Sequence, residues 1–235
     1  MELSGPDSEL KTEWQQFLIK HPTDVQSIQK IDFSETFPII YDTQGRKFSI
    51  DFINDFSNYH KKKSSIKTEL ISKAMGGGKK GLRLLDLSAG LGIDAIFLSQ
   101  LGYTVTALER NSIIYLALST AWKKLPTESR KLIKFIYASA EDFLDQPTED
   151  FDVCYFDPMF PDKKKSALPK QQMILFKQLV GSDEDASQVI EKLLKSKKFS
   201  RLVVKRPLKA DALFCKPQSC ISGKLIRFDI YGGLK

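Results

Sequence analysis

Apolar segments of strand length alternate with segments of helical spacing from residue 82 onward, and this alternation limits the possible folds. Strands are predicted over 82–87, 104–108, 132–137, 153–156 and 201–205, and helices over 94–101, 113–123, 141–145 and 186–195. Such alternation predicts a mostly parallel sheet, because each crossover lays a helix against one face. The segments 219–222 and 225–231 read as a C-terminal β-hairpin. The sequence therefore predicts an α/β fold with helices on both faces of the sheet.

The first 55 residues have a different character and predict a small α+β unit. A helix is predicted over 9–20, and short strands over 28–33, 38–41 and 47–52. A further helix is predicted over 66–75, just before the alternating region. We therefore divide the chain into an N-terminal α+β appendage, residues 1–55, and an α/β domain, residues 56–235.

The composition excludes several classes of protein. Of the 235 residues, 42% are hydrophobic, which is enough for one substantial core. No apolar run approaches the roughly 18 residues of a membrane span, and the first residues lack the basic-then-apolar order of a signal peptide. Three cysteines without a C-x-x-C pair, and only two histidines, indicate neither a disulfide framework nor a metal site. We expect a cytoplasmic protein without a membrane or a metal partner.

The positive charge of the chain is clustered along the sequence. The formal net charge is +7, and basic residues gather at 61–63, 79–80, 163–165, 195–198 and 205–206. Clusters of this kind favour a polyanionic partner such as nucleic acid. For any single cluster, an ordinary solvated basic surface remains the alternative.

A glycine-containing turn, Ser88-Ala89-Gly90-Leu91-Gly92, lies between the first core strand and its helix. Glycine lets the backbone approach a ligand closely, and ligands of such sheets bind at the carboxyl ends of the strands. Glu109 ends the second core strand, where an acid can accept hydrogen bonds from ribose hydroxyls. Because Gly90-x-Gly92-x-x-Ala95 also fits a dinucleotide fingerprint, the glycines alone leave a nicotinamide cofactor open.

Acidic residues beside this turn favour S-adenosylmethionine over a pyrophosphate cofactor. Asp86 precedes the turn, where its charge can help to hold the amino-acid portion of S-adenosylmethionine; alternatively, it only caps the turn. Asp94 lies near the start of the next helix and could contact the methionine end. Ser139 and Ala140 follow the third strand, on the side expected for adenine.

The segment after the fourth core strand reads as a site for a flat, amine-bearing ring. Asp157 and the carbonyl of Pro158 can accept hydrogen bonds from an exocyclic amine, and Phe160 can stack on the ring. Such an amine is a poor nucleophile, so catalysis depends on aiming its nitrogen at the methyl group. Asp157 is the candidate proton acceptor. Since Asp-Pro is a common turn pair, an ordinary turn with a buried Phe is the alternative.

Basic residues near this segment are candidates for contact with RNA. Lys163, Lys164 and Lys165 follow the Asp-Pro-x-Phe tetrad directly. Lys205 and Arg206 end the next core strand, and we expect both side chains to face the same crevice and hold phosphate. His60 and Lys61 precede the core; RNA backbone contact is a possible role there, and an idle surface histidine is the simpler explanation.

Several segments together resemble the RsmJ family of methyltransferases, which act on guanine N2 in small-subunit ribosomal RNA. The most specific is Asp157-Pro158-Met159-Phe160-Pro161 with the following basic run 163–168. The runs 203–207 and 227–231 add to it. The resemblance extends from about residue 48 to the end of the chain. It implies a class I, Rossmann-like methyltransferase sheet, S-adenosyl-L-methionine as cofactor, and 16S ribosomal RNA or the small subunit as partner.

The resemblance also implies a set of cofactor contacts. These are Ile93, Asp94, Glu109, Arg110, Ser139, Ala140 and Asp157. The chain departs from the family at two of these positions. Ile93 stands where the family usually has Arg, and Ala140 where it commonly has a second Ser, so a charged side chain and a hydroxyl are lost.

Two alternative functions stay open. The first is N6-adenine methylation, although those enzymes often have two adjacent prolines where this chain has Pro158-Met159. The second is a catalytically silent RNA-binding module on the same fold. The intact set of Gly90, Gly92, Glu109 and Asp157 argues against it.

Overall fold

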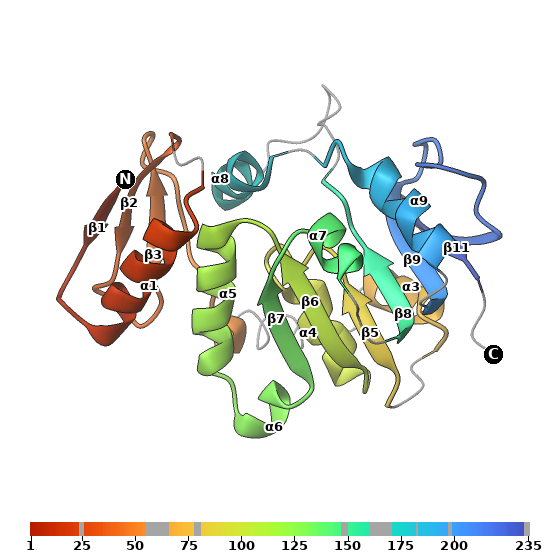
Figure 1. The fold of residues 1–235 in the computed structure, drawn as a ribbon, viewed down its shortest axis with the longest axis horizontal. Coiled ribbons are helices and arrows are strands. Elements are labelled where there is room, and N and C mark those ends of the chain that lie inside the picture. The colour runs from red at the N-terminus through yellow and green to blue at the C-terminus, as the bar shows by residue number, and fades with distance from the viewer. Residues whose placement is uncertain are drawn as a thin grey trace.

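The computed structural model describes residues 1–23, 26–54, 66–77, 81–146, 150–159, 171–181, 183–196 and 199–232. Two β-sheets organise these residues, one near the N-terminus and a larger one that spans the rest of the chain (Figure 1). Phe160, Lys163, Lys164, Lys165, His60 and Lys61, all named above as candidates, lie outside the described residues.

The larger sheet has seven strands in the order β10-β11-β9-β8-β5-β6-β7. The strands are β5 (Arg83–Asp86), β6 (Thr104–Glu109), β7 (Ile133–Tyr137), β8 (Phe151–Phe156), β9 (Phe199–Pro207), β10 (Ser219–Ser222) and β11 (Ile226–Tyr231). The five strands from β7 to β9 are parallel, and β11 pairs antiparallel with both β9 and β10. This arrangement confirms the predicted parallel sheet with a C-terminal hairpin.

Helices cover both faces of this sheet. The helices in this part of the chain are α3 (Ile66–Ala74), α4 (Ile93–Gln100), α5 (Ser112–Lys123), α6 (Thr127–Arg130), α7 (Ala140–Asp145), α8 (Gln171–Val180) and α9 (Ala186–Ser196). In Figure 1, α7 and α9 lie in front of the sheet, and α3 and α4 lie behind it. The α/β fold class predicted from the alternation is confirmed.

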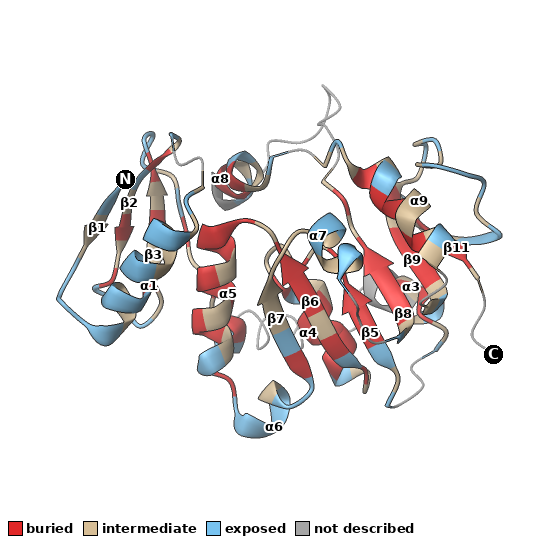
Figure 2. Ribbon diagram, viewed as in Figure 1, coloured by how far each residue is buried: buried red, intermediate tan, exposed pale blue. Residues whose placement is uncertain are grey.

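Successive residues of the central strands face the two helical layers in turn. On β5, Leu84 packs in the cluster that includes α4 and α5, whereas Leu85 packs in the cluster that includes α9. Val203 and Val204 on β9 divide in the same way. Because such strands are buried on both faces, they read as continuous apolar runs, and Figure 2 shows them as buried.

The N-terminal residues form a four-stranded sheet with one helix. Its order is β1-β2-β3-β4, and the elements are β1 (Glu2–Ser4), α1 (Glu9–Lys20), β2 (Ile28–Asp32), β3 (Ile39–Asp42) and β4 (Lys47–Phe48). Trp14 of α1 is fully buried, and its indole Nε1 donates a hydrogen bond to Thr120 Oγ1 of α5 at 3.1 Å. One apolar cluster therefore runs from this sheet into the core beneath α5.

Some predicted elements were wrong or missing. The strand predicted over 47–52 ends at Phe48, and Phe52, Ile53 and Asn54 form a helical turn instead. The Asp51 carboxylate accepts hydrogen bonds from the Ile53 and Asn54 amides at 3.0 and 3.1 Å, which starts that turn. The elements β1, α6 and α8 were not predicted. Of these, β1 is a short edge strand that depends on pairing with β2.

Candidate functional site

A cavity of about 500 Å³ lies at the carboxyl ends of the central parallel strands. Eight of the predicted site residues line it: Gly90, Ile93, Asp94, Glu109, Arg110, Ala140, Asp157 and Lys205. They come from the loops after β5, β6, β7 and β8 and from the end of β9. The parallel strands therefore bring together residues more than a hundred positions apart, as in other open α/β sheets.

The two glycines of the turn have different roles. Gly90 lines the cavity with φ of 54°, and a Cβ there would lie 3.2 Å from Phe176 Cζ. Gly92 caps α4 with φ of 73°, and a Cβ there would lie 2.8 Å from Leu118 Cδ2 and 2.9 Å from Phe52 Cζ. Gly90 therefore fits the predicted close approach to a ligand, whereas Gly92 permits close packing of α4 against Leu118 and Phe52.

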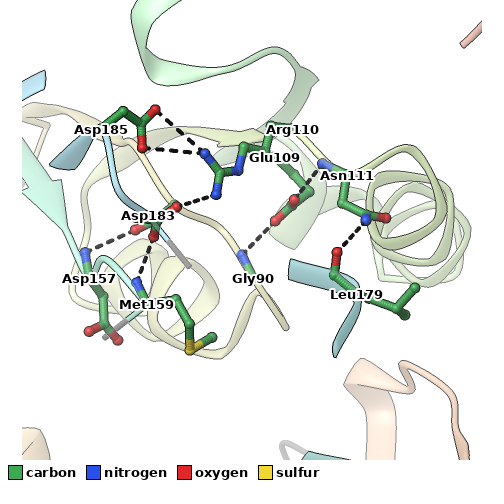
Figure 3. A network of polar contacts seen from close by, with 10 residues as sticks. Gly90, Glu109, Arg110, Asn111, Asp157, Met159, Leu179, Asp183 and Asp185 are labelled. Carbon is green, nitrogen blue, oxygen red and sulfur yellow. Dashed lines mark hydrogen bonds and ion pairs between the residues drawn. The ribbon is translucent and has the colours of Figure 1, made fainter. Parts of the chain in front are cut away.

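Glu109 fixes the geometry of the turn from the end of β6. Its carboxylate accepts hydrogen bonds from the Gly90 amide at 3.0 Å and the Asn111 amide at 2.7 Å (Figure 3). Burial raises the pKa of Glu109 to about 7, although both amides oppose the shift. Since a carboxylate has about four acceptor positions, it can still accept a ligand hydroxyl.

Asp86 lies beneath the cavity rather than on its lining. It is 1% exposed, and its Oδ1 accepts a hydrogen bond from the Ser88 amide at 3.0 Å. Its Oδ2 is buried without a hydrogen-bond partner among the described residues. Burial raises the pKa of Asp86 to about 8, and the nearby carboxylates of Asp94 and Asp157 add to the shift. The turn-capping contact that was the alternative explanation is thus present.

One half-buried lysine, Lys205, pairs with carboxylates from two different segments of the cavity lining. Lys205 Nζ pairs with Asp94 Oδ2 at 3.1 Å and makes a short ion pair with Asp157 Oδ2. The Tyr155 hydroxyl also donates to Asp94 Oδ2, at 2.7 Å. Burial alone would lower the pKa of Lys205, but the carboxylates of Asp157 and Asp94 outweigh it and raise that pKa. Lys205 therefore remains a cation at neutral pH.

The acceptor segment, residues 157–159, begins directly after β8. The Asp157 amide donates to Ser88 Oγ at 2.9 Å, which links this segment to the cofactor turn. The Asp157 carboxylate lines the cavity, with a third of its side-chain surface exposed. Pro158 is buried and is not among the described residues that line the cavity. Asp157 is therefore placed to meet a ligand directly.

Two further predicted residues point away from the cavity. Ser139 caps α7: its Oγ accepts from the Asp142 amide at 3.0 Å, and it contacts Asp142 Oδ2 at 2.7 Å. The prediction that Arg206 shares a crevice with Lys205 is wrong. The Arg206 guanidinium donates to the Asp211 carbonyl on the other side of β9, because successive residues of a strand face opposite sides.

Sequence reasoning missed several residues of the site. Asp183 and Asp185, which precede α9, form ion pairs with Arg110 at 2.6 and 3.4 Å. Phe176 and Val180 line the cavity from α8. The apolar positions 175, 176, 179 and 180 follow helical spacing, so the sequence did contain a signal for α8. No comparable pattern marks Asp183.

The lining of the cavity fits S-adenosylmethionine. This cofactor carries a sulfonium and an ammonium cation, and the lining offers the carboxylates of Asp94 and Asp157, both of which pair with Lys205. Leu87, Leu108, Phe156 and Val189 supply an apolar wall against which an adenine ring can lie. Glu109 is available to the ribose. Ile93 lines the cavity but, being apolar, offers only backbone contacts to polar groups.

The described part of the chain contains neither a membrane-spanning helix nor a cluster of metal-binding side chains. Over the described ranges, no helix is long and apolar enough to cross a membrane. Over the same ranges, no group of three His, Cys, Asp or Glu residues could hold a metal ion. The cysteines Cys154, Cys215 and Cys220 are free, and Cys154 is buried in β8.

Comparisons with known proteins agree with this geometry. The family model "Putative SAM-dependent methyltransferase" matches residues 19–233. A ribosomal RNA small subunit methyltransferase J of Bdellovibrio bacteriovorus is 42% identical over 194 residues, which are 82% of this chain and 77% of the relative. The protein of the same name from Marinobacter nauticus is 37% identical over 192 residues, which are 77% of this chain and 68% of the relative.

A solved structure shows the same fold. The crystal structure of an S-adenosylmethionine-dependent methyltransferase from Neisseria gonorrhoeae superposes with a TM-score of 0.72. The two chains are 23% identical, and the match covers 98% of this chain and 94% of the other. The likeness supports the class I methyltransferase fold independently of the sequence motifs.

Proposed function

The chain belongs to the RsmJ family of S-adenosylmethionine-dependent methyltransferases, and from this premise we propose that it methylates the N2 amine of a guanine in 16S ribosomal RNA. Relatives named ribosomal RNA small subunit methyltransferases support the substrate class. The observation that supports the proposal most is that Asp94, Glu109 and Asp157 line one cavity. We propose that Asp94 and Glu109 form its cofactor side and Asp157 its acceptor side.

The residues of the cavity have separable tasks in this proposal. Asp94 and Glu109 would hold the cofactor, which supplies an electrophilic methyl group when it is bound. Asp157 would accept a hydrogen bond from the guanine amine, and that bond strengthens as positive charge develops on the nitrogen. Because Lys205 stays protonated at neutral pH, it cannot take the proton that the amine must lose. Asp157 is therefore the proposed proton acceptor.

The base and the RNA require further groups around the cavity. Phe160 is proposed to stack on the guanine, and Lys163, Lys164 and Lys165 to hold the RNA backbone, with His60 and Lys61 as secondary candidates. The net charge of +7 supports a polyanionic partner. We place the protein in the cytoplasm, where ribosomal RNA is available and where thiols such as Cys215 and Cys220 stay reduced.

Guanine is favoured over adenine by the hydrogen-bonding groups of the two bases. The N2 amine of guanine stands beside the N1–H donor, so one carboxylate can accept from both. The N6 amine of adenine stands beside the N1 acceptor, which a carboxylate would repel. Asp157 therefore suits guanine better, and N6-adenine methylation is the second candidate.

Replacing Asp157 with alanine tests the proposed role. We expect Asp157→Ala to reduce methyl transfer to ribosomal RNA by at least about a hundredfold, as for loss of a group that acts in the transition state. RNA affinity should remain near the wild-type value. Transfer is measured with radiolabelled S-adenosylmethionine, and RNA binding by fluorescence anisotropy. Asp145→Ala, on the exposed surface of α7, serves as the control and should keep wild-type turnover. Wild-type turnover in Asp157→Ala would refute the assignment.

A further inference from the structure

The carboxylate of Asp183 is hydrogen-bonded to the acceptor segment. Its Oδ2 accepts a hydrogen bond from the Met159 amide at 2.6 Å, and the Asp183 amide donates to the Met159 carbonyl at 3.3 Å. This reciprocal pair joins the chain just before α9 to the residue two positions after Asp157. Asp183 therefore acts on the acceptor segment through its side chain and its backbone together.

The other oxygen of Asp183 reaches toward the cofactor side. Asp183 Oδ1 forms an ion pair with Arg110 Nη2 at 2.6 Å. Arg110 directly follows Glu109, whose carboxylate holds the Gly90 amide of the cofactor turn. Figure 3 shows the continuous path from Gly90 through Glu109 and Arg110 to Asp183 and Met159.

We propose that Asp183 is a positioning residue that holds the acceptor segment, residues 157–159, in register with the cofactor turn. This inference rests on the proposed methyl transfer. In-line transfer requires the acceptor nitrogen, the methyl carbon and the leaving sulfur to align, and a displacement of about 1 Å can cost about a hundredfold in rate. Asp183 lines the same cavity, and its proposed action on the acceptor goes through the Met159 amide.

The chemistry of this carboxylate is suited to the task. Burial raises the pKa of Asp183, while the Met159 amide and the Arg110 guanidinium favour its charged form. Its side chain is only 12% exposed, so these charge-assisted contacts are protected from water. Asp185 also pairs with Arg110, but at 3.4 Å, with a third of its side chain exposed and no contact with Met159 among its described interactions. Of these two aspartates, only Asp183 joins Arg110 to the acceptor segment through its described contacts.

Matched replacements of these two aspartates separate the positioning role of Asp183 from the effect of removing a negative charge beside Arg110. Asp183→Asn and Asp185→Asn remove the same charge next to the same arginine. The amide of Asp183→Asn has one acceptor oxygen, so it cannot serve both Met159 and Arg110. We expect Asp183→Asn to lower kcat about a hundredfold, with the Kd for S-adenosylmethionine within about threefold of wild type. Asp145→Asn, on the exposed surface of α7, should lower kcat by less than about threefold.

A second measurement follows the segment without any substrate. Hydrogen exchange at the Met159 amide, read by mass spectrometry, should accelerate in Asp183→Asn and stay at the wild-type rate in Asp185→Asn. Unchanged protection of the Met159 amide in Asp183→Asn, equal acceleration of exchange in Asp183→Asn and Asp185→Asn, or equal kcat in Asp183→Asn and Asp145→Asn would overturn the positioning role. Absence of methyl transfer by the wild-type protein would instead refute the proposed function, and the exchange result would still decide the role of Asp183.

Discussion

At the scale of single residues, carboxylates dominate the site, and the sequence revealed only some of them. Asp157 and Glu109 could be predicted because each ends an apolar strand, and strand ends converge in a parallel sheet. Asp183 could not be predicted, because its partner Met159 lies 24 positions earlier and no periodic pattern joins them. Arg206 was misplaced because the alternation of side chains along β9 was overlooked.

Asp86 gives a prediction for the dependence of stability on pH. Its pKa rises from 3.8 to about 8 on folding, so the folded protein holds this proton more tightly than the unfolded chain. Its contribution to stability is therefore complete below pH 3.8 and is lost as the pH rises toward 8. We expect the Tm of the wild type to fall more steeply between pH 5 and 8 than the Tm of Asp86→Asn, by several degrees.

Scanning calorimetry across this pH range measures the effect. Asp145→Asn is the control, because that carboxyl is 63% exposed, and it should keep the wild-type slope. Identical slopes for Asp86→Asn and the wild type would show that Asp86 does not cause the fall of Tm with pH.

At the scale of elements, helix α8 connects the wall of the cavity to the N-terminal sheet. It lies between the two sheets in Figure 1 and packs against β4, and Arg46 next to β4 donates to Gln178 Oε1 of α8 at 3.0 Å. The same last turn of the helix is also held by Asn111 Nδ2, which donates to the Leu179 carbonyl at 2.7 Å. The helix thereby forms one wall of the cavity and ties it to the N-terminal sheet.

Removal of the buried face of α8 should destabilise the protein. Leu175 is fully buried, so Leu175→Ala is expected to lower the free energy of unfolding by about 2–5 kcal/mol. Met173 on the same helix is 39% exposed, and Met173→Ala should cost less than about 1 kcal/mol. Urea denaturation followed by circular dichroism measures both. Similar losses in the two variants would contradict the packing described for α8.

At the scale of the whole molecule, the parallel sheet and its covering helices were predicted, but the connection to the N-terminal sheet was not. The strand–helix alternation determines the topology through the handedness and order of crossovers. The contact of Trp14 with Thr120 joins positions 106 apart and leaves no trace in local periodicity. We propose that residues 1–55 and 56–235 form two units that unfold together, because one apolar cluster spans both.

Trp14→Ala tests this coupling. Loss of its buried ring and hydrogen bond should cost about 3–5 kcal/mol. Trp122, on α5, is then the only tryptophan, so its emission, excited selectively at long wavelength, reports the unfolding of the core. We expect the Trp122 transition to shift together with the transition seen by circular dichroism. Ile19→Ala, at a position of α1 that is 75% exposed, should leave both transitions in place. A core transition unchanged by Trp14→Ala would show that the two units are independent.

The central claim is transfer of a methyl group from S-adenosylmethionine to guanine N2 of small-subunit ribosomal RNA. The most direct measurement incubates the protein with radiolabelled cofactor and small subunits that lack the modification, and then identifies the labelled nucleoside after digestion. The account predicts label in N2-methylguanosine. Label in N6-methyladenosine would contradict the assigned acceptor, and no label in any nucleoside, from subunits or naked RNA, would contradict the proposed function itself.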